Sequence, residues 1–405
     1  MNKIITLSTI LSITLYATNG DNLINIGTKA RGMGGAGIAL YHGAESSLTN
    51  PSLITRLENN EFSVGGILFK PEMATELFPT AGVNIPPQSS FKSDNDISFI
   101  PEISYVYQIN DNWYLGAGIW GTAGMGIDYS NAPFNPLVNG TFGNFNMVTS
   151  LQLLQTGISL AYKTGGLSIG ILPILQYGNM NISYKTPTPQ GTIADIGTDE
   201  ATNFGFGYNF GLSYAFSNGF SIGGVYKSSI QMDYGKQLTT ATTPFMLAFP
   251  YDNTLAQPSE YGMGISYTKG NHTFAYDYKK VNWAHAKGYS DFGWRNSNVY
   301  AFGYQYSQNN WALRAGYNYA SFTVVEVEDT RLNFFNLLGF PATSERHYTL
   351  GGSYDFSNNF TFDLAYVYQP KSTKTFSTAK LDLPFSSITT EHVENSMSFQ
   401  LNYNF

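Results

Sequence analysis

The sequence lacks cysteine and is poor in charge. None of its 405 residues is cysteine, which excludes disulfides, thiolate metal sites and thiol nucleophiles. Charged residues make up 12% of the chain, against about 25% in ordinary soluble proteins, so they are too few to cover an aqueous surface of this size. The formal net charge of -7 also argues against a nucleic-acid partner, because the chain has no excess of basic residues to neutralise phosphates.

Long apolar runs are missing as well. A transmembrane helix needs about 20 apolar residues, and the one marked apolar run, from Ile4 to Leu15, is shorter than that. It follows Lys3 and precedes the small residue Ala17, which is the pattern of a secretory signal peptide. We therefore predict that residues 1–17 are a signal peptide and that the mature chain is exported without a transmembrane helix.

What the sequence has in abundance is aromatic residues in alternation. Aromatic side chains make up 16% of the chain, and in the segments 204–214, 360–368 and 397–405 large apolar side chains occupy every second position. The positions between them carry mostly small or polar residues. Side chains alternate across a strand, so one face of each strand is greasy and the other is small and polar. This pattern is typical of strands that separate lipid from the lumen of a transmembrane β-barrel.

The alternation extends through the chain and predicts fourteen strands. They span 61–70, 97–108, 113–128, 150–164, 166–185, 202–216, 219–235, 258–269, 271–282, 297–307, 310–325, 344–356, 359–369 and 393–405. Short turns alternate with longer loops between them, as in outer-membrane barrels, where the short turns face the periplasm. The predicted fold class is therefore all-β: a closed, 14-stranded antiparallel transmembrane β-barrel over residues 61–405, with both ends in the periplasm.

Residues 18–60 precede this barrel and follow a different pattern. They show no alternation and are rich in glycine among small apolar residues. A 14-stranded barrel is wider than its own side chains can fill. We therefore predict that residues 18–60 form an N-terminal hatch, a plug that folds back into the lumen.

Two motifs in this segment resemble a known family. The runs 28–37 and 48–54 resemble the N-terminal hatch of the FadL/TodX family of outer-membrane transporters of long-chain fatty acids and aromatic hydrocarbons, with Ser52 in place of the alanine of the family's Asn-Pro-Ala motif. The resemblance continues in 155–163, 311–317, 345–351 and the last strand. It implies passive uptake of hydrophobic ligands, which are captured on outer loops, passed to an internal pocket and released into the membrane through a lateral opening where one strand kinks inward.

The resemblance leads to three sets of candidate site residues. The hatch motif comprises Gly32, Gly34, Gly35, Asn50, Pro51 and Ser52. The candidates for the lateral-opening kink are Gly121, Gly124 and Gly126, because closely spaced glycines weaken a strand ladder, and Pro101 removes a ladder donor in the preceding strand. The candidates for substrate binding are the apolar loop residues Phe245, Leu247, Phe249, Leu337 and Leu338. The alternatives are that the glycines make room for the hatch and that the apolar loop residues pack against one another over the barrel mouth.

Motifs for chemistry are weak. Gly-rich runs at 32–37 and 116–121 lack the strand-turn-helix context of a dinucleotide site, and runs at 166–170 and 219–223 lack that of a nucleophile elbow. The five histidines have no metal-ligand spacing. We predict no catalytic residues, no metal, no cofactor and no enzymatic activity. The alternatives are an outer-membrane lipid hydrolase with a Ser-His pair at the outer rim, a general porin, or a structural or adhesive protein.

The predicted partners follow from this picture. They are a hydrophobic small molecule, either a fatty acid or a hydrocarbon, together with the lipid and lipopolysaccharide of a Gram-negative outer membrane, and we expect a monomer and no nucleic acid. The terminal Phe405 resembles the signal that the barrel assembly machinery reads, although it can also be an ordinary strand end. A fatty acid would need a cation near its carboxylate, and Arg314, at a lumen-facing position, is one candidate.

Overall fold

Long antiparallel strands build the structure, a computed structural model that describes residues 19–79, 90–132, 145–188, 190, 192–197, 199–247, 252–379 and 385–405. Fourteen strands form the ring: β1 (Glu61–Pro79), β3 (Ser98–Gln108), β4 (Trp113–Asp128), β5 (Val148–Thr164), β6 (Leu167–Pro187), β8 (Ala201–Ala215), β9 (Phe220–Lys227), β10 (Glu260–Lys269), β11 (His272–Val281), β12 (Ser297–Gln308), β13 (Trp311–Ala320), β14 (Arg346–Asp355), β15 (Phe360–Ser377) and β16 (Phe385–Asn404). Two short strands, β2 (Phe91–Lys92) and β7 (Ile193–Gly197), pair with β1 and β6.

The ring is closed by its first and last strands. Each barrel strand pairs with its neighbours along the chain, and β16 pairs with β1 from Glu61↔Asn404 to Pro79↔Phe385. Closure matters because an open edge in lipid would leave backbone groups without hydrogen bonds, at a cost of several kcal/mol each. In the part of the chain that the structure describes, no helix is long and apolar enough to cross a membrane. The predicted fold class, a closed 14-stranded antiparallel barrel, is confirmed.

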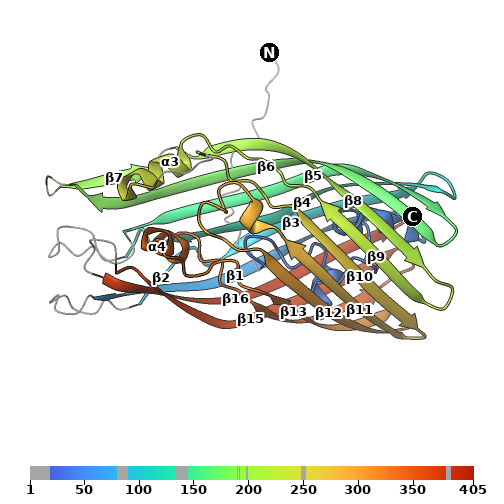
Figure 1. Cartoon of the computed structure of the whole chain (residues 1–405). Helices are drawn as coiled ribbons and strands as arrows, with labels where there is room; N and C mark the ends of the chain where they lie inside the picture. The colour runs from blue at the N-terminus through green and yellow to red at the C-terminus, as the bar shows by residue number, and fades with distance from the viewer. Residues whose placement is uncertain are drawn as a thin grey trace, which may run out of the picture.

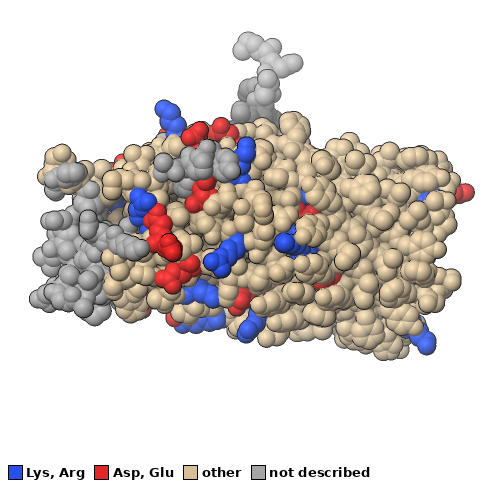
Figure 2. Space-filling model, viewed as in Figure 1, with Lys and Arg blue, Asp and Glu red and all other residues tan. Residues whose placement is uncertain are grey.

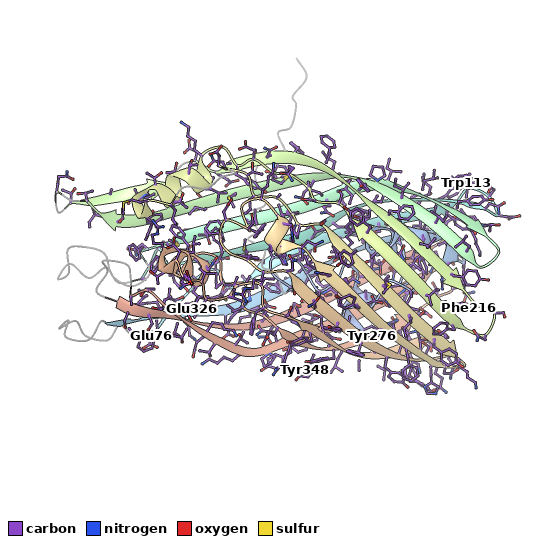
Figure 3. All side chains as sticks on the ribbon, viewed as in Figure 1. Glu76, Trp113, Phe216, Tyr276, Glu326 and Tyr348 are labelled. Carbon is purple, nitrogen blue, oxygen red and sulfur yellow. The ribbon has the colours of Figure 1, made fainter. Side chains whose placement is uncertain are left out.

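The outer surface of the barrel carries the greasy face of the alternation. Figure 2 shows a broad surface without charged residues over β8 to β13, while Lys, Arg, Asp and Glu gather toward the end with the long loops. Trp113 and Phe216 point outward at the end with the short turns, and Glu76 and Glu326 lie at the opposite end (Figure 3). This division of aromatic and charged residues matches an apolar belt with aromatic residues at its interface.

Three strands run further than the alternation predicts. β1 extends to Pro79, β15 extends to Ser377 and β16 begins at Phe385, whereas the predicted limits were 70, 369 and 393. The ladder between β1 and β16 continues through polar partners such as Thr75↔Thr390. The greasy period ends where the wall leaves the lipid, but backbone pairing needs no greasy face and therefore continues.

Two predicted strands are shorter than expected, because β13 ends at Ala320 and not at 325, and β9 ends earlier still relative to its prediction. The prediction for 219–235 is wrong beyond Lys227, where β9 ends. The next residues bend into the lumen, and Ile230 and Met232 lie over Gly205 of β8. They stay paired with the segment before β10 through the bridge Ile230↔Gln257. The alternation is real here, but its apolar side faces the interior of the protein instead of lipid.

Residues 19–60 lie inside the ring, and we call them the hatch. Nearly every residue from Asn19 to Thr55 is buried. The hatch contains the short helices α1 (Thr28–Gly32), α2 (Ser46–Thr49) and η1 (Pro51–Arg56) (Figure 1, blue). Pro51 begins η1, and the Asn50 side chain caps it by accepting a hydrogen bond from the Ser52 backbone N–H at 3.1 Å.

The long loops gather at the end of the barrel opposite the short turns. They carry α3 (Gln237–Thr242), η3 (Thr243–Phe245), η4 (Trp283–His285) and α4 (Thr330–Leu338). Figure 1 shows α3 and α4 over the end of the barrel opposite the short turns. The predicted signal peptide, residues 1–17, lies outside the described residues.

Candidate functional site

The hatch touches the barrel wall at matched glycines. Gly34 has a φ of +68°, and a Cβ there would lie 2.6 Å from the Phe302 carbonyl oxygen of β12. On the wall, a Cβ at Gly316 would overlap the Gly34 nitrogen, and one at Gly211 would overlap the Asn50 Oδ1. These glycines therefore let two backbones approach more closely than any side chain permits.

The hatch motif around Asn50 forms a hydrogen-bonded turn on the wall. The Asn50 Nδ2 donates to the Ile38 carbonyl oxygen at 2.7 Å, and the Asn50 Oδ1 accepts from the Ser52 Oγ at 2.8 Å. The Ser52 Oγ, whose hydrogen is used in that bond, lies 3.0 Å from the Ser213 Oγ of β8 and accepts a hydrogen bond from it. The serine that replaces the family's alanine therefore adds a contact between the hatch and the wall.

A buried cation also fixes the hatch. Arg31, which is 0% exposed, donates from its Nε to the Ser398 Oγ at 2.8 Å and from its Nη2 to the Ser396 Oγ at 2.6 Å, both on β16. Burial lowers the pKa of Arg31 to about 10, a loss that nearby Glu102 and Glu394 partly offset. No role for Arg31 could be predicted from the sequence, because its partners lie more than 360 residues away.

The wall is interrupted between β3 and β4. Their ladder runs from Gln108↔Tyr114 only to Glu102↔Trp120, although β4 continues to Asp128 along β5. The β4–β5 register shifts between Gly121 and Ala123. The ladder between β3 and β4 thus ends at Glu102 of β3 and Trp120 of β4. We call the unpaired interval between the two strands, from this point toward the end with the long loops, the wall gap.

The first residues of the hatch occupy the edge of β4 at the wall gap. The Leu23 N–H donates to the Thr122 carbonyl oxygen at 3.1 Å, the Gly124 N–H donates to the Asp21 carbonyl oxygen at 2.9 Å, and Asn22 forms a bridge with Ala123. The hatch therefore acts here as a short extra strand.

The three candidate kink glycines have different surroundings. A Cβ at Gly121 would overlap the Ile100 side chain of β3, and one at Gly126 would overlap the Thr149 backbone of β5. Gly124 instead contacts the hatch through its N–H. The absence of a side chain at Gly121 and Gly126 thus makes room for the neighbouring strands β3 and β5. Of the three glycines, only Gly124 contacts the hatch directly.

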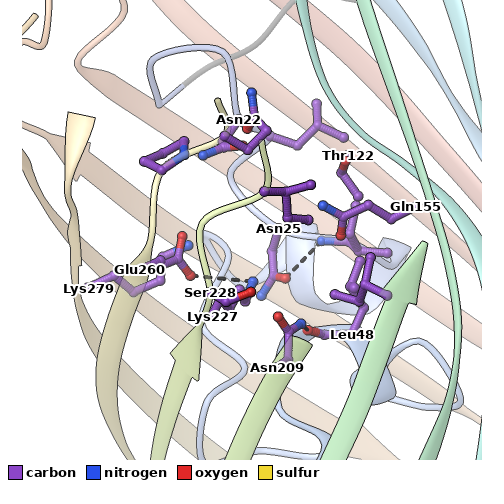
Figure 4. Close-up of a pocket in the computed structure, with 16 residues that line it drawn as sticks. Asn22, Asn25, Leu48, Thr122, Gln155, Asn209, Lys227, Ser228, Glu260 and Lys279 are labelled. Atoms are coloured by element: carbon purple, nitrogen blue, oxygen red, sulfur yellow. Dashed lines mark hydrogen bonds and ion pairs between the residues drawn. The ribbon is translucent and has the colours of Figure 1, made fainter. Parts of the chain in front are cut away.

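A cavity of about 80 Å³ lies in the lumen between the hatch and β9 to β11 (Figure 4). The Lys227 Nζ and the Glu260 Oε1 are 3.3 Å apart, and Lys279 lines the cavity beside them. Two lysines thus face one carboxylate. The apolar part of the lining consists of Leu23, Ile26, Leu48, Ile174 and Ile230. Thr122 and Asn22 also line the cavity, so it reaches the wall gap.

Arg314, the candidate carboxylate partner, is already engaged. Its Nε donates to the Gln305 Oε1 and its Nη1 to the Ser353 Oγ, both at 2.6 Å, and Asp363 is 4.0 Å away. It lines a different, polar cavity beside Lys29 and Arg56 at the end of the hatch. The cations that line the lumen cavity are instead Lys227 and Lys279, neither of which was a candidate from the sequence.

The candidate capture residues meet over the outer mouth. Phe245 stacks against Phe334 at 5.8 Å between ring centroids and meets Phe335 edge-on at 4.7 Å. Leu337 and Leu338 are 0% exposed, and the partly buried Leu247 packs on the same core. Phe249 lies outside the described residues. The structure therefore brings the two predicted loop clusters together, and their side chains pack against each other.

Two histidines meet a serine and a carboxylate near the outer loops, and the His392 Nε2 lies 3.1 Å from the Glu394 Oε1. The Ser344 Oγ donates to the Glu394 Oε1 at 2.8 Å, His392 lies 3.4 Å from the same Oγ, and the His347 Nε2 lies 3.2 Å from the Glu394 Oε2. The serine hydroxyl thus points at the carboxylate, where a nucleophile would need to point at the base. Across the described part of the chain, no group of three or more His, Asp or Glu residues has a metal-binding arrangement.

The sequence matches known proteins at two levels, a family and individual relatives. The family described as outer membrane protein transport protein (OMPP1/FadL/TodX) matches residues 14–405. Outer membrane protein P1 of Haemophilus influenzae is 26% identical over 182 residues, or 40% of this chain and 38% of that protein. The long-chain fatty acid transport protein of Escherichia coli K12 is 27% identical over 116 residues, or 28% of this chain and 23% of that protein. The match therefore spans less than half the length of either relative.

A solved structure shares the fold over nearly the whole chain. The toluene transporter TodX of P. putida superposes with a TM-score of 0.71 at 20% sequence identity. The superposition covers 94% of this chain and 99% of that chain. At this level of identity the likeness establishes the fold.

Proposed function

Because this chain belongs to the family of outer membrane protein transport proteins that includes FadL and TodX, we propose that it carries hydrophobic compounds passively across the outer membrane. A greasy solute crosses water and the polar lipopolysaccharide layer poorly, so a protein-lined path that ends in the membrane lowers both barriers. The observation that carries this proposal is one cavity whose lining includes the hatch, two lysines and the edge of β4 at the wall gap.

The proposed route has three stages. A ligand first enters between the apolar loop residues around Phe245 and α4, where Met246 is 84% exposed. It then reaches the lumen cavity above the hatch. It leaves sideways through the wall gap when residues 21–23 release the edge of β4, which only a few backbone hydrogen bonds hold. Gly121, Gly124 and Gly126 serve this exit by allowing the irregular course of β4.

The cavity favours a ligand with an acidic head and an apolar tail. Lys227 and Lys279 together outnumber the single carboxylate of Glu260, so an incoming carboxylate would find a surplus cation. A charge-assisted hydrogen bond of this kind is about twice as strong as a neutral one. We therefore propose long-chain fatty acids as the main substrate class, with neutral hydrocarbons as weaker ligands.

A disulfide lock tests the route. The chain has no cysteine, so the double variant Asn22→Cys and Ala123→Cys carries one cysteine pair, and bridged antiparallel residues lie within disulfide range. We expect the oxidised variant to take up labelled oleate at roughly the rate of cells without the protein, and dithiothreitol to restore uptake. Each single variant is the control. Full uptake by the oxidised protein would exclude exit through the wall gap.

The remaining partners are also proposals. We propose that the protein acts as a monomer, contacts lipid and lipopolysaccharide along its belt, and is recognised by the barrel assembly machinery through Phe405. That residue is 49% exposed and stacks on Tyr403 at the end of β16.

A further inference from the structure

One buried carboxyl group joins the wall gap to the outer loops. Asp21 is 0% exposed. Its Oδ2 accepts a hydrogen bond from the Gln257 Nε2 at 2.8 Å and another from the Tyr289 hydroxyl. Its backbone carbonyl oxygen accepts from the Gly124 N–H of β4 at 2.9 Å. Three segments that are distant in the sequence therefore meet at this residue.

The loops pack closely around it. A Cβ at Gly20, which has a φ of +81°, would lie 2.6 Å from the Trp283 ring, so the hatch backbone touches η4 directly. Trp283 meets Tyr289 edge-on at 4.7 Å between centroids. The loop segments that carry Gln257, Trp283 and Tyr289 thus contact residues 20–21, and Asp21 also holds the edge of β4. These contacts connect the loops to the residue that helps to close the wall gap.

We propose that Asp21 is a latch that couples the outer loops to the wall gap, and that ionisation of its carboxyl group loosens the latch. The inference rests on the proposed exit through the wall gap. Asp21 acts here as a positioning residue, because it holds backbone and loops together and needs no contact with a ligand.

The electrostatic surroundings give the direction. Burial raises the pKa of Asp21 to about 6, and the hydrogen bonds from Tyr289 and Gln257 partly oppose this rise. The titratable groups that face it are Tyr289 and Tyr234, and burial raises the pKa of both above the ordinary tyrosine range, so both stay neutral near pH 7. Lys227, Glu260 and Lys279 line the cavity that Asn22 also lines.

The sign follows from linkage. The closed latch binds a proton more tightly than an Asp21 exposed to water, so a falling pH stabilises the closed state until the exposed carboxyl group of the open state is protonated as well. Above about pH 6 the closed state holds a buried charge and loses that advantage. We expect the opening equilibrium to rise about tenfold between pH 5 and pH 7.

Hydrogen exchange measures this equilibrium without any ligand. Amide exchange of the peptides that contain residues 19–26 and 122–126, detected by mass spectrometry and converted to protection factors, removes the intrinsic pH dependence of exchange and reports opening. We expect protection in the native protein to fall about tenfold from pH 5 to pH 7. In Asp21→Asn, which keeps the shape and cannot ionise, protection should be independent of pH.

Two further variants make the result decisive. Tyr289→Phe removes a hydrogen bond that lowers the pKa of Asp21, so the midpoint of the pH profile should move upward, which loss of packing alone would not cause. Asp96→Asn, at an exposed carboxylate, should keep the native profile.

The outcomes of this experiment separate the latch from the route. A flat profile in the native protein, or an unchanged profile in Asp21→Asn, overturns the latch. If the native protein shows the expected pH dependence but the disulfide lock fails to stop oleate uptake, then the latch exists and the proposed exit does not.

Discussion

At the residue scale, function depends on side chains whose partners are far away in the sequence. Lys227 ends β9 and Glu260 begins β10, and they meet because they are directly opposite partners at the end of the ladder between these strands. No short-range spacing of residues in the sequence indicates such a pair. Asp21 and Arg31 were missed for the same reason, whereas the glycines of the hatch were found because their crowding in the sequence is itself the signal.

Lys279 allows a direct test of head-group recognition. It lines the lumen cavity, and Lys280, its neighbour on β11, has the opposite parity and faces outward. We expect Lys279→Met to weaken binding of a fluorescent fatty acid roughly tenfold through loss of a charge-assisted contact. Binding of a neutral hydrocarbon should stay unchanged. Lys280→Met is the matched control, and equal effects of the two variants on fatty-acid binding would argue against a role for the cavity.

At the element scale, alternation located the strands well and their ends less well. It failed where two different causes produce the same period. Residues 228–235 alternate because they pair with 253–257 inside the lumen, and no local feature distinguishes that from a lipid-facing strand. The capture residues show a related limit. Their apolar character was read correctly, but the burial of Leu337 and Leu338 depends on how α4 docks on the other loops.

Gly211 is the point of closest approach between the Asn50 side chain of the hatch and β8. A Cβ at Gly211 would overlap the Asn50 Oδ1, whereas a Cβ at Gly224 on β9 would have only the Gly262 oxygen within reach, at 3.9 Å. We expect Gly211→Ala to destabilise docking of the hatch by about 1–3 kcal/mol, as overpacking commonly does. Limited proteolysis of residues 19–60 in detergent would measure it. Gly224→Ala is the control, and equal protease resistance in both variants would mean that the wall yields easily.

At the scale of the whole molecule, the sequence was most informative. Closure, strand number and the greasy belt all follow from one requirement, that backbone groups in lipid be paired and side chains facing lipid be apolar. That requirement acts on every strand, so its signal is repeated along the chain and survives errors at single elements. The position of the wall gap has no such repetition, because it depends on a single register shift between Gly121 and Ala123.

A plugged barrel and an open porin differ in how they conduct ions. The hatch fills much of the lumen with buried residues, and the cavity between the hatch and the wall gap is about 80 Å³. In planar bilayers we therefore expect little steady conductance from the native protein, and a steady conductance roughly tenfold or more higher from a variant that lacks residues 24–50, because an empty barrel of this strand number is wide enough for water and ions. Heat-modifiable migration on gels would verify that the truncated barrel still folds. A large steady conductance from the native protein would instead favour a general porin, because ions would then have a continuous aqueous path past the hatch.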